Sequence, residues 1–179
     1  KGQKLIHPNN DVNKGQSSND TIPKAVHIMI VKLANEKLLP ALSNLEEALE
    51  QKEKEFYNII KIGRTHMQDA VPMRLSDEFG AYKTQIINNK KRIEFALNGL
   101  KELALGATAI GTGLNAPKGF AQLAIEKISQ FTNVEYKQAP NLFEAIASKD
   151  SVNFFASSLN TIASSMIKIA SDIRFLSCG

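Results

Sequence analysis

Apolar residues recur every three or four positions over long stretches of this sequence, and this pattern limits the folds that the chain can adopt. Between residues 159 and 176 the steps run 3-4-3-4-3, and a second stripe extends over residues 75–105. Such spacing places apolar side chains on one face of an α-helix, as in the seam of a helix bundle. A seam of this length is buried only against other helices, in the same chain or in a partner. The sequence therefore predicts an all-α fold, a long-helix bundle that oligomerises. The stripes consist of Leu75, Phe79, Tyr82, Ile86, Ile93, Leu97, Leu100 and Ala104, and of Leu159, Ile162, Met166, Ile169, Ile173 and Leu176.

The remaining segments alternate between helical and turn-rich patterns. We expect helices over about residues 21–61, 75–105 and 141–176, and a shorter one that ends near residue 130. Pro40 interrupts the first of these, because proline lacks a backbone N–H. Polar or glycine-rich loops are expected at residues 1–20, 62–72 and 106–117, with Asn19 or Asp20 as the N-cap of the first helix. Residues 134–136 are a weak strand candidate. We predict one domain over residues 1–179, a helical bundle with an N-terminal polar loop at residues 1–20.

Composition argues against several classes of protein. The net charge is +4, but Lys and Arg are scattered, and Trp is absent, so we expect no nucleic-acid partner. No run of 18 apolar residues is present, so we expect no membrane span. Cys178 is the single cysteine and no secretory signal is visible, which indicates a reducing compartment, the cytoplasm.

The first polar loop ends in Ser17, Ser18 and Asn19, directly before a predicted helix. Hydroxyl and amide groups at that place are suited to binding an anion, because free backbone N–H groups and the helix dipole act on the same point. Local chemistry alone favours capping and turn formation by Ser18, Asn19 and Asp20 over anion binding. His7 and Asp11 are conceivable metal ligands, but no second His or carboxylate stands at ligand spacing, so we expect no metal.

The second and third loops carry a histidine and three glycines. His66 follows Thr65 in a polar loop, where a histidine serves either in proton transfer near neutral pH or as a structural residue. The third loop, residues 106–115, lacks the GxxxxGK[ST] spacing and a preceding strand, so a tight connection between helices is favoured over a phosphate site. We therefore expect no nucleotide cofactor.

Five strings take the interpretation further, and together they resemble the fumarase/aspartase superfamily. They are HPNNDVNKGQSSND, KIGRTHMQDAVPM, LGATAIGTGLN, APNLFEA and KIASDIRFL, and they occur in the family's order from Lys4 to the end of the chain. The class II fumarases are most similar, because His66 follows GRT where aspartases carry Gln. APNLFEA is also fumarase-like, whereas Ala107 stands where fumarases often have Gly.

The resemblance implies the central helical domain of this fold, in a homotetramer associated through its long helices, with neither metal nor cofactor. The implied activity is reversible hydration of fumarate to L-malate, a step of the tricarboxylic acid cycle. His66 matches the histidine of proton transfer, and Thr65 matches a substrate contact. Ser17, Ser18 and Asn19 match the segment that binds a substrate carboxylate. The second, non-catalytic dicarboxylate site of the family is matched by His7, Pro8, Asn9 and Asn10, with Asn10 where Asp is common.

Two family motifs are missing from this sequence. The loop with the SSxMPxKxN signature, which carries the catalytic serine, is absent, as is an N-terminal Ser/Thr segment. We therefore expect a central part of a longer enzyme that is inactive on its own. The alternatives are an aspartate ammonia-lyase or another lyase of the superfamily, and a non-catalytic helical oligomerisation scaffold.

Overall fold

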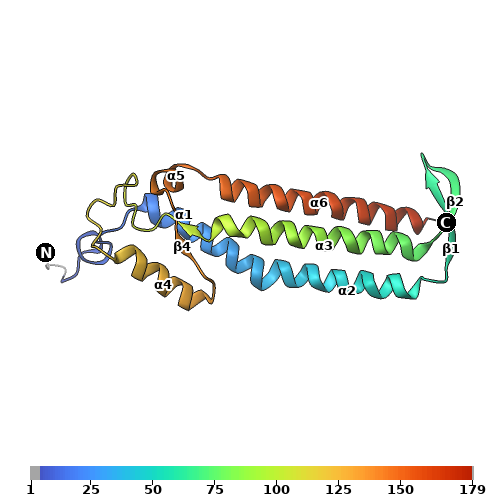
Figure 1. Cartoon of the computed structure of the whole chain (residues 1–179), viewed down its shortest axis with the longest axis horizontal. Coiled ribbons are helices and arrows are strands. Elements are labelled where there is room, and N and C mark those ends of the chain that lie inside the picture. The colour runs from blue at the N-terminus through green and yellow to red at the C-terminus, as the bar shows by residue number, and fades with distance from the viewer. Residues whose placement is uncertain (1–4, 179) are drawn as a thin grey trace. The chain divides into compact units, whose positions relative to one another are not determined.

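The computed structural model describes residues 5–178, and the side chains of Asn9 and Asn10 lie outside that description. Most of the described chain is helical, which confirms the predicted fold class (Figure 1). It divides into two compact units. The first contains the residues up to 33 together with residues 96–154, and the second contains residues 34–95 and those from 155 onward. The single-domain boundaries expected from the sequence stay a prediction.

Three long helices lie side by side in the second unit (Figure 1). They are α2 (Leu39–Glu55), α3 (Leu75–Leu100, up to residue 95) and α6 (Asp150–Leu176, from residue 155). Lys90 of α3 forms an ion pair with Glu46 of α2 at 2.8 Å. The Tyr82 hydroxyl donates to Asp172 of α6 at 3.0 Å. Polar contacts therefore tie α3 to both neighbours around an apolar centre.

The stripe predicted on α3 is the centre of the core. Tyr82 is 2% exposed, and Ile86 and Ile93 are fully buried. Toward the end of the helix, in the first unit, Leu97 and Leu100 continue the buried face. Only part of the seam predicted on α6 is buried within this chain. Ile162 and Ile169 are buried, whereas Leu159, Ile173 and Leu176 are each nearly two-fifths exposed.

The interruption predicted at Pro40 is present as a change of helix type. A π-helical turn, η2 (Ala34–Leu38), follows α1 (Ser18–Leu33) and precedes α2, in whose first turn Pro40 lies. Because proline offers no N–H to the carbonyl four residues before it, the regular α pattern cannot run through this point. The first-helix prediction was too long at its other end, since α2 ends at Glu55.

The predicted loop at residues 62–72 is wrong, because these residues belong to a β-hairpin. Strand β1 (Ile60–Thr65) pairs antiparallel with β2 (Gln68–Arg74). The register shifts between Ile62 and Arg64, so Gly63 forms a bulge. Its position leaves no room for a side chain, since a Cβ atom there would lie 2.9 Å from the carbonyl oxygen of Val71. The hairpin belongs to the second unit.

The first unit combines short helices with one pair of short parallel strands. It contains η1 (Pro8–Val12), α1, α4 (Phe120–Thr132) and α5 (Leu142–Ala147). Strand β3 (Glu102–Leu103) pairs with β4 (Lys137–Gln138), one residue beyond the weak strand candidate. The expected loop at residues 1–20 is therefore wrong in part, because η1 forms within it and α1 already begins at Ser18.

In the described part of the chain, no helix is long and apolar enough to cross a membrane.

Candidate functional site

Helix α1 begins with a reciprocal cap made by Ser17 and Asp20. The Ser17 hydroxyl accepts from the N–H of Asn19 at 3.2 Å, and the Ser17 N–H donates to Oδ1 of Asp20, also at 3.2 Å. This arrangement satisfies two backbone donors that a helix start leaves without partners. The N-cap is thus Ser17, and the prediction of Asn19 or Asp20 was wrong. The reason is that Asp20 is the third helical residue, from which its carboxylate reaches back to Ser17.

Asp20 is also the buried centre of this region. The residue is completely buried, and its Oδ2 atom accepts from the N–H of Gly106 at 3.2 Å and from that of Thr108 at 3.1 Å. A buried charge needs hydrogen bonds and a counter-charge to be tolerated. Lys24, one turn further along α1, supplies the counter-charge, with Nζ 3.5 Å from Oδ2. The carboxylate therefore joins the start of α1 to the glycine-rich loop.

Lys24 is itself almost completely buried and also donates to the backbone carbonyl of Asp20. Burial lowers the pKa of Lys24 to about 8, although the neighbouring Asp20 carboxylate acts in the opposite direction. Desolvation disfavours the charged ammonium, whereas the carboxylate favours it. Lys24 therefore loses its charge in mildly alkaline solution.

Glycines of the glycine-rich loop adopt backbone conformations that other residues rarely take. Gly106, Gly111 and Gly113 all have positive φ, and a Cβ atom on Gly106 would lie 2.6 Å from that of Ala121. Thr108 is 5% exposed and has a φ of 58°, which is unusual for a β-branched residue. Two backbone N–H groups bonded to Asp20 hold this segment in place. The tight helix-to-helix connection predicted here is wrong, because strand β3 precedes this irregular loop and α4 begins only at Phe120.

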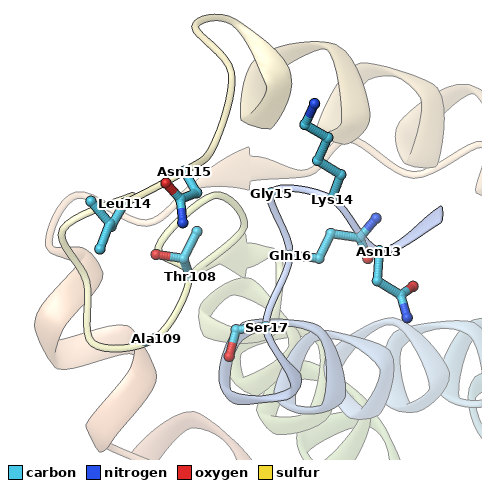
Figure 2. Close-up of a pocket in the computed structure, with 9 residues that line it drawn as sticks. All are labelled: Asn13, Lys14, Gly15, Gln16, Ser17, Thr108, Ala109, Leu114 and Asn115. Atoms are coloured by element: carbon cyan, nitrogen blue, oxygen red, sulfur yellow. The ribbon is translucent and has the colours of Figure 1, made fainter. Parts of the chain in front are cut away.

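A pocket of about 590 Å³ opens between the segment before α1 and this loop (Figure 2). Figure 2 shows Ser17 at the start of the helix, with Thr108 and Asn115 on the facing loop. Among the nine described residues that line the pocket, Lys14 alone carries a charge. Amide, hydroxyl and ammonium groups are suited to an anionic oxygen ligand. The lining residues are Asn13, Lys14, Gly15, Gln16, Ser17, Thr108, Ala109, Leu114 and Asn115.

Ser18 and Asn19 occupy the first turn of α1 beside this pocket, and both are exposed. The Asn19 side-chain amide donates to the carbonyl oxygen of Ala109 at 2.9 Å, a second link from α1 to the glycine-rich loop. The structure thus gathers the three predicted carboxylate-binding residues, Ser17, Ser18 and Asn19, at one helix start.

The residues predicted for a second dicarboxylate site lie at η1. His7 and Pro8 are exposed, and the side chains of Asn9 and Asn10 fall outside the described residues. The His7 N–H donates to Oδ2 of Asp11 at 2.6 Å. Asp11 is thus engaged in fixing the backbone of the turn. In residues 5–178, no group of three or more His, Cys, Asp or Glu side chains has the geometry to hold a metal ion.

His66 lies at the tip of the hairpin in the second unit. Thr65 and Gln68 close a two-residue turn, in which His66 has a φ of 51° and Met67 a φ of 59°. Two consecutive positive φ values are required by the type I′ turn, which normally carries Asn-Gly. Thr65, His66 and Met67 are exposed. The turn therefore presents an imidazole on a backbone conformation that non-glycine residues rarely adopt.

Contacts along the hairpin fix the strands that carry this turn. Arg64 forms an ion pair with Asp69 across the strands at 3.3 Å, and its guanidinium lies 5.7 Å from the centre of the Phe175 ring on α6. Lys61 pairs with Glu78 of α3 at 2.7 Å. These contacts connect strand β1 to two of the long helices of its unit.

The predicted site residues thus fall into two groups, one in each unit, with Ser17, Ser18 and Asn19 in the first and Thr65 and His66 in the second. Sequence reasoning missed the roles of Asp20 and Thr108. The spacing of Ser17 and Asp20 fits a capping box and was an available signal. No local signal pointed to Thr108, because its N–H is bonded to a residue 88 positions away.

Comparisons with known proteins place the chain in a family. The model of a family described as lyase matches residues 1–179. The chain is 52% identical over 177 residues to a class II fumarate hydratase of Rhizobium meliloti, which covers 99% of this chain and 38% of that protein. A mitochondrial fumarate hydratase of Dictyostelium discoideum is 51% identical, and the match covers 99% of this chain and 36% of that protein. The chain therefore spans well under half the length of these curated relatives.

Solved structures agree with the sequence relatives. A crystal structure of a class II fumarase from Schistosoma mansoni superposes with a TM-score of 0.96 at 38% identity, covering 100% of this chain and 40% of that one. A fumarate lyase/delta crystallin structure from Brucella melitensis gives a TM-score of 0.93 at 42% identity, with 97% and 38% covered. Similarity over the whole of this chain confirms the predicted fold. Because the family model matches every residue, the chain belongs to the lyase family, in which class II fumarate hydratases are among its relatives.

Proposed function

We propose that the protein to which this chain belongs catalyses the reversible hydration of fumarate to L-malate. The observation that carries the proposal is an identity of 52% to a class II fumarate hydratase over 177 residues, nearly the full chain. The geometry adds support, because the polar residues lie at the start of α1 and at the tip of the hairpin. Buried hydrogen bonds of Asp20 fix the first position, and a cross-strand ion pair fixes the second. Such positions are where binding and catalytic groups usually lie.

We assign carboxylate binding to Ser17, Ser18 and Asn19. The dipole of α1 favours an anion at this helix start, and Ser17 lines a pocket with polar walls. Thr65, which closes the hairpin turn, is assigned a further substrate contact. His7, Pro8, Asn9 and Asn10 are proposed as a second dicarboxylate site.

His66 is assigned the transfer of a proton through the water that is added or removed. In dehydration, a general base accepts a proton from the carbon beside one carboxylate, which builds an aci-carboxylate dianion, and the hydroxyl group then receives a proton from a general acid and departs as water. Hydrogen-bond donors directed at the dianion oxygens stabilise that transition state by several kcal/mol, on the order of 3 per donor. Histidine is suited to protonating the departing hydroxyl, because it gains and loses a proton near neutral pH.

We further propose that the protein is a cytoplasmic homotetramer that associates through its long helices and acts in the tricarboxylic acid cycle. The support for association lies on α6, where Leu159, Ile173 and Leu176 of the predicted seam are each nearly two-fifths exposed. An apolar face of this kind on a long helix is usually covered by another helix. Sedimentation of the full-length protein as a monomer would contradict this part of the proposal.

Malate dehydration by the full-length protein, followed through the absorbance of fumarate, tests the proposed activity. His66→Asn should lower kcat/KM by about 10² or more, the usual effect of removing a general acid–base group. Asparagine is the suitable replacement, because it tolerates the left-handed backbone that His66 adopts at a φ of 51°. The matched control is Met67→Ala in the same turn, where an exposed side chain is removed. The control should retain turnover within about twofold.

A wild-type protein without fumarate or malate turnover would refute the proposed activity. Turnover that survives His66→Asn would instead refute only the role assigned to His66. Aspartate ammonia-lyase activity is the second candidate, favoured by Ala107 at a position where fumarases often have Gly. Release of ammonia from aspartate would favour that candidate over malate dehydration.

A further inference from the structure

One buried carboxylate contacts both walls of the pocket beside Ser17. The segment before α1 reaches it through the N–H of Ser17, and the glycine-rich loop reaches it through the N–H groups of Gly106 and Thr108. Ser17 and Thr108 are lining residues of that pocket on opposite sides (Figure 2). Asp20 lies in the first turn of α1 and is fully buried. This side chain is therefore one of the contacts that set the width of the pocket.

The hydrogen bonds of Asp20 need an ionised carboxylate and cannot be supplied by an amide. A carboxylate only accepts, and its two oxygens receive three backbone N–H groups here, with an ammonium group at 3.5 Å. An asparagine in the same place would direct its NH₂ group at one of these donors. At least one wall of the pocket would then lose its attachment.

We propose that Asp20 is a positioning residue for dicarboxylate binding, because its carboxylate fixes the start of α1 against the loop that contains Thr108. This inference rests on the proposed function, since it assigns Ser17, Ser18 and Asn19 to the substrate carboxylate. Asp20 itself is too deeply buried to touch a ligand. It acts through the backbone N–H groups of Ser17 and Thr108, whose positions set the distance between the two walls.

The Asn19 amide adds a weaker connection between the same two segments. It donates to the Ala109 carbonyl at 2.9 Å on the exposed side of the contact, whereas Asp20 holds the buried side. A hydrogen bond at the surface competes with water, so it does not replace a buried, charge-assisted set. Loss of Asp20 should therefore loosen the pocket even while Asn19 is intact.

Binding of succinate, a saturated four-carbon dicarboxylate, provides the test in the full-length protein. Asp20→Asn should raise the dissociation constant of succinate by roughly tenfold or more, as expected when a charge-assisted hydrogen bond is lost. The kcat/KM for malate should fall by at least the same factor. The pH midpoints of kcat/KM should stay where they are, because the carboxylate takes no part in proton transfer.

The double variant Asp20→Asn/Lys24→Met separates positioning from general stability. It removes the buried ammonium that the single variant leaves without its counter-charge, so its melting temperature should recover. The dissociation constant of succinate should nevertheless stay raised. Glu46→Gln is the matched control, since Glu46 also pairs with a lysine but joins α2 to α3 in the second unit. The control should change succinate binding by less than about twofold.

Hydrogen exchange in the wild-type protein gives a readout that needs no variant. The amides of Ser17, Gly106 and Thr108 should become protected together, by similar factors, as succinate is added. Protection of Ser17 without Gly106 and Thr108 would overturn the inference. So would succinate binding that recovers in the double variant along with the melting temperature, or that stays within twofold of wild type in Asp20→Asn. Turnover of malate by the wild type tests the proposed function separately. The role of Asp20 is tested only by the ratios of succinate dissociation constants between variants and wild type, and by amide hydrogen exchange.

Discussion

Met67 occupies the second position of the hairpin turn with a φ of 59°, and its side chain is 81% exposed. An L-residue in this conformation brings its Cβ atom too close to the following carbonyl oxygen, which costs about 1–2 kcal/mol. Glycine has no Cβ atom and adopts this conformation freely. Met67→Gly should therefore stabilise the hairpin, because it relieves the strain and removes little buried surface.

The expected gain is smaller than the strain itself. Glycine makes the unfolded chain more flexible, which offsets about 0.4–1 kcal/mol of the relief. The net stabilisation against local opening should be about 0.5–1 kcal/mol. At 1.4 kcal/mol for each factor of ten, this corresponds to opening that is about two- to fivefold rarer.

Amide hydrogen exchange at residues 60–65 and 68–74 measures this local opening directly. Met67→Ala is the control, because alanine loses the same exposed side chain but keeps the Cβ atom. Exchange in the alanine variant should be close to wild type. Equal slowing in both variants would refute the argument from backbone strain and would point to the removal of an exposed apolar group instead.

Two further predictions concern the first unit. Because burial lowers the pKa of Lys24 from 10.5 to about 8, the unfolded chain binds more protons than the folded protein between these values. Urea titrations of the wild type and of Lys24→Met measure this effect. The free energy of unfolding of the wild type, minus that of the variant, should rise between pH 8 and pH 10.5. A difference that does not change with pH would contradict the assigned desolvation of Lys24. Gly111→Ala should lower the melting temperature more than Gly119→Ala, and equal losses would speak against the packing argument. Both have positive φ, but the added Cβ atom would lie 2.7 Å from the Phe143 ring at Gly111 and would meet no atom within 4 Å at Gly119.

The helical part of the fold was predictable because its signal is periodic and local. The stripe on α3 was assigned from spacing alone, and Tyr82, Ile86 and Ile93 are buried as predicted. The change of helix type near Pro40 followed from one missing N–H group. Helix ends were less predictable, because α2 and α3 end where the chain turns into strands that spacing does not reveal.

The hairpin was missed because both of its usual sequence signals are absent. Its turn carries His66 and Met67 in place of Asn-Gly, and its strands are largely exposed, so no clean alternation of apolar and polar residues marks them. What stabilises the hairpin is supplied from elsewhere in the unit, by contacts of Lys61 with α3 and of Arg64 with α6. Neither contact can be read from the local sequence.

The residues of the candidate site were found through resemblance, and their support was found only in three dimensions. Ser17, Ser18 and Asn19 were named from a matched string, but Asp20 was taken for a cap and nothing more. Its partners Gly106 and Thr108 are 86 and 88 residues away, beyond the reach of any local rule. The sequence reasoning therefore named the groups proposed to touch substrate and missed the carboxylate that we propose holds them.

Local rules of protein structure fail in this chain at two places in particular, and the two failures share a physical logic. His66 and Met67 take a turn conformation that suits glycine, and Asp20 is a charged side chain with no exposure. Each arrangement is unfavourable by itself and persists only because surrounding contacts fix it. Sequences are usually consistent with their folds at every level, so departures of this kind concentrate where a side chain must be held in place for chemistry. That reasoning, independent of any relative, favours the hairpin tip in the second unit and the start of α1 in the first as functional positions.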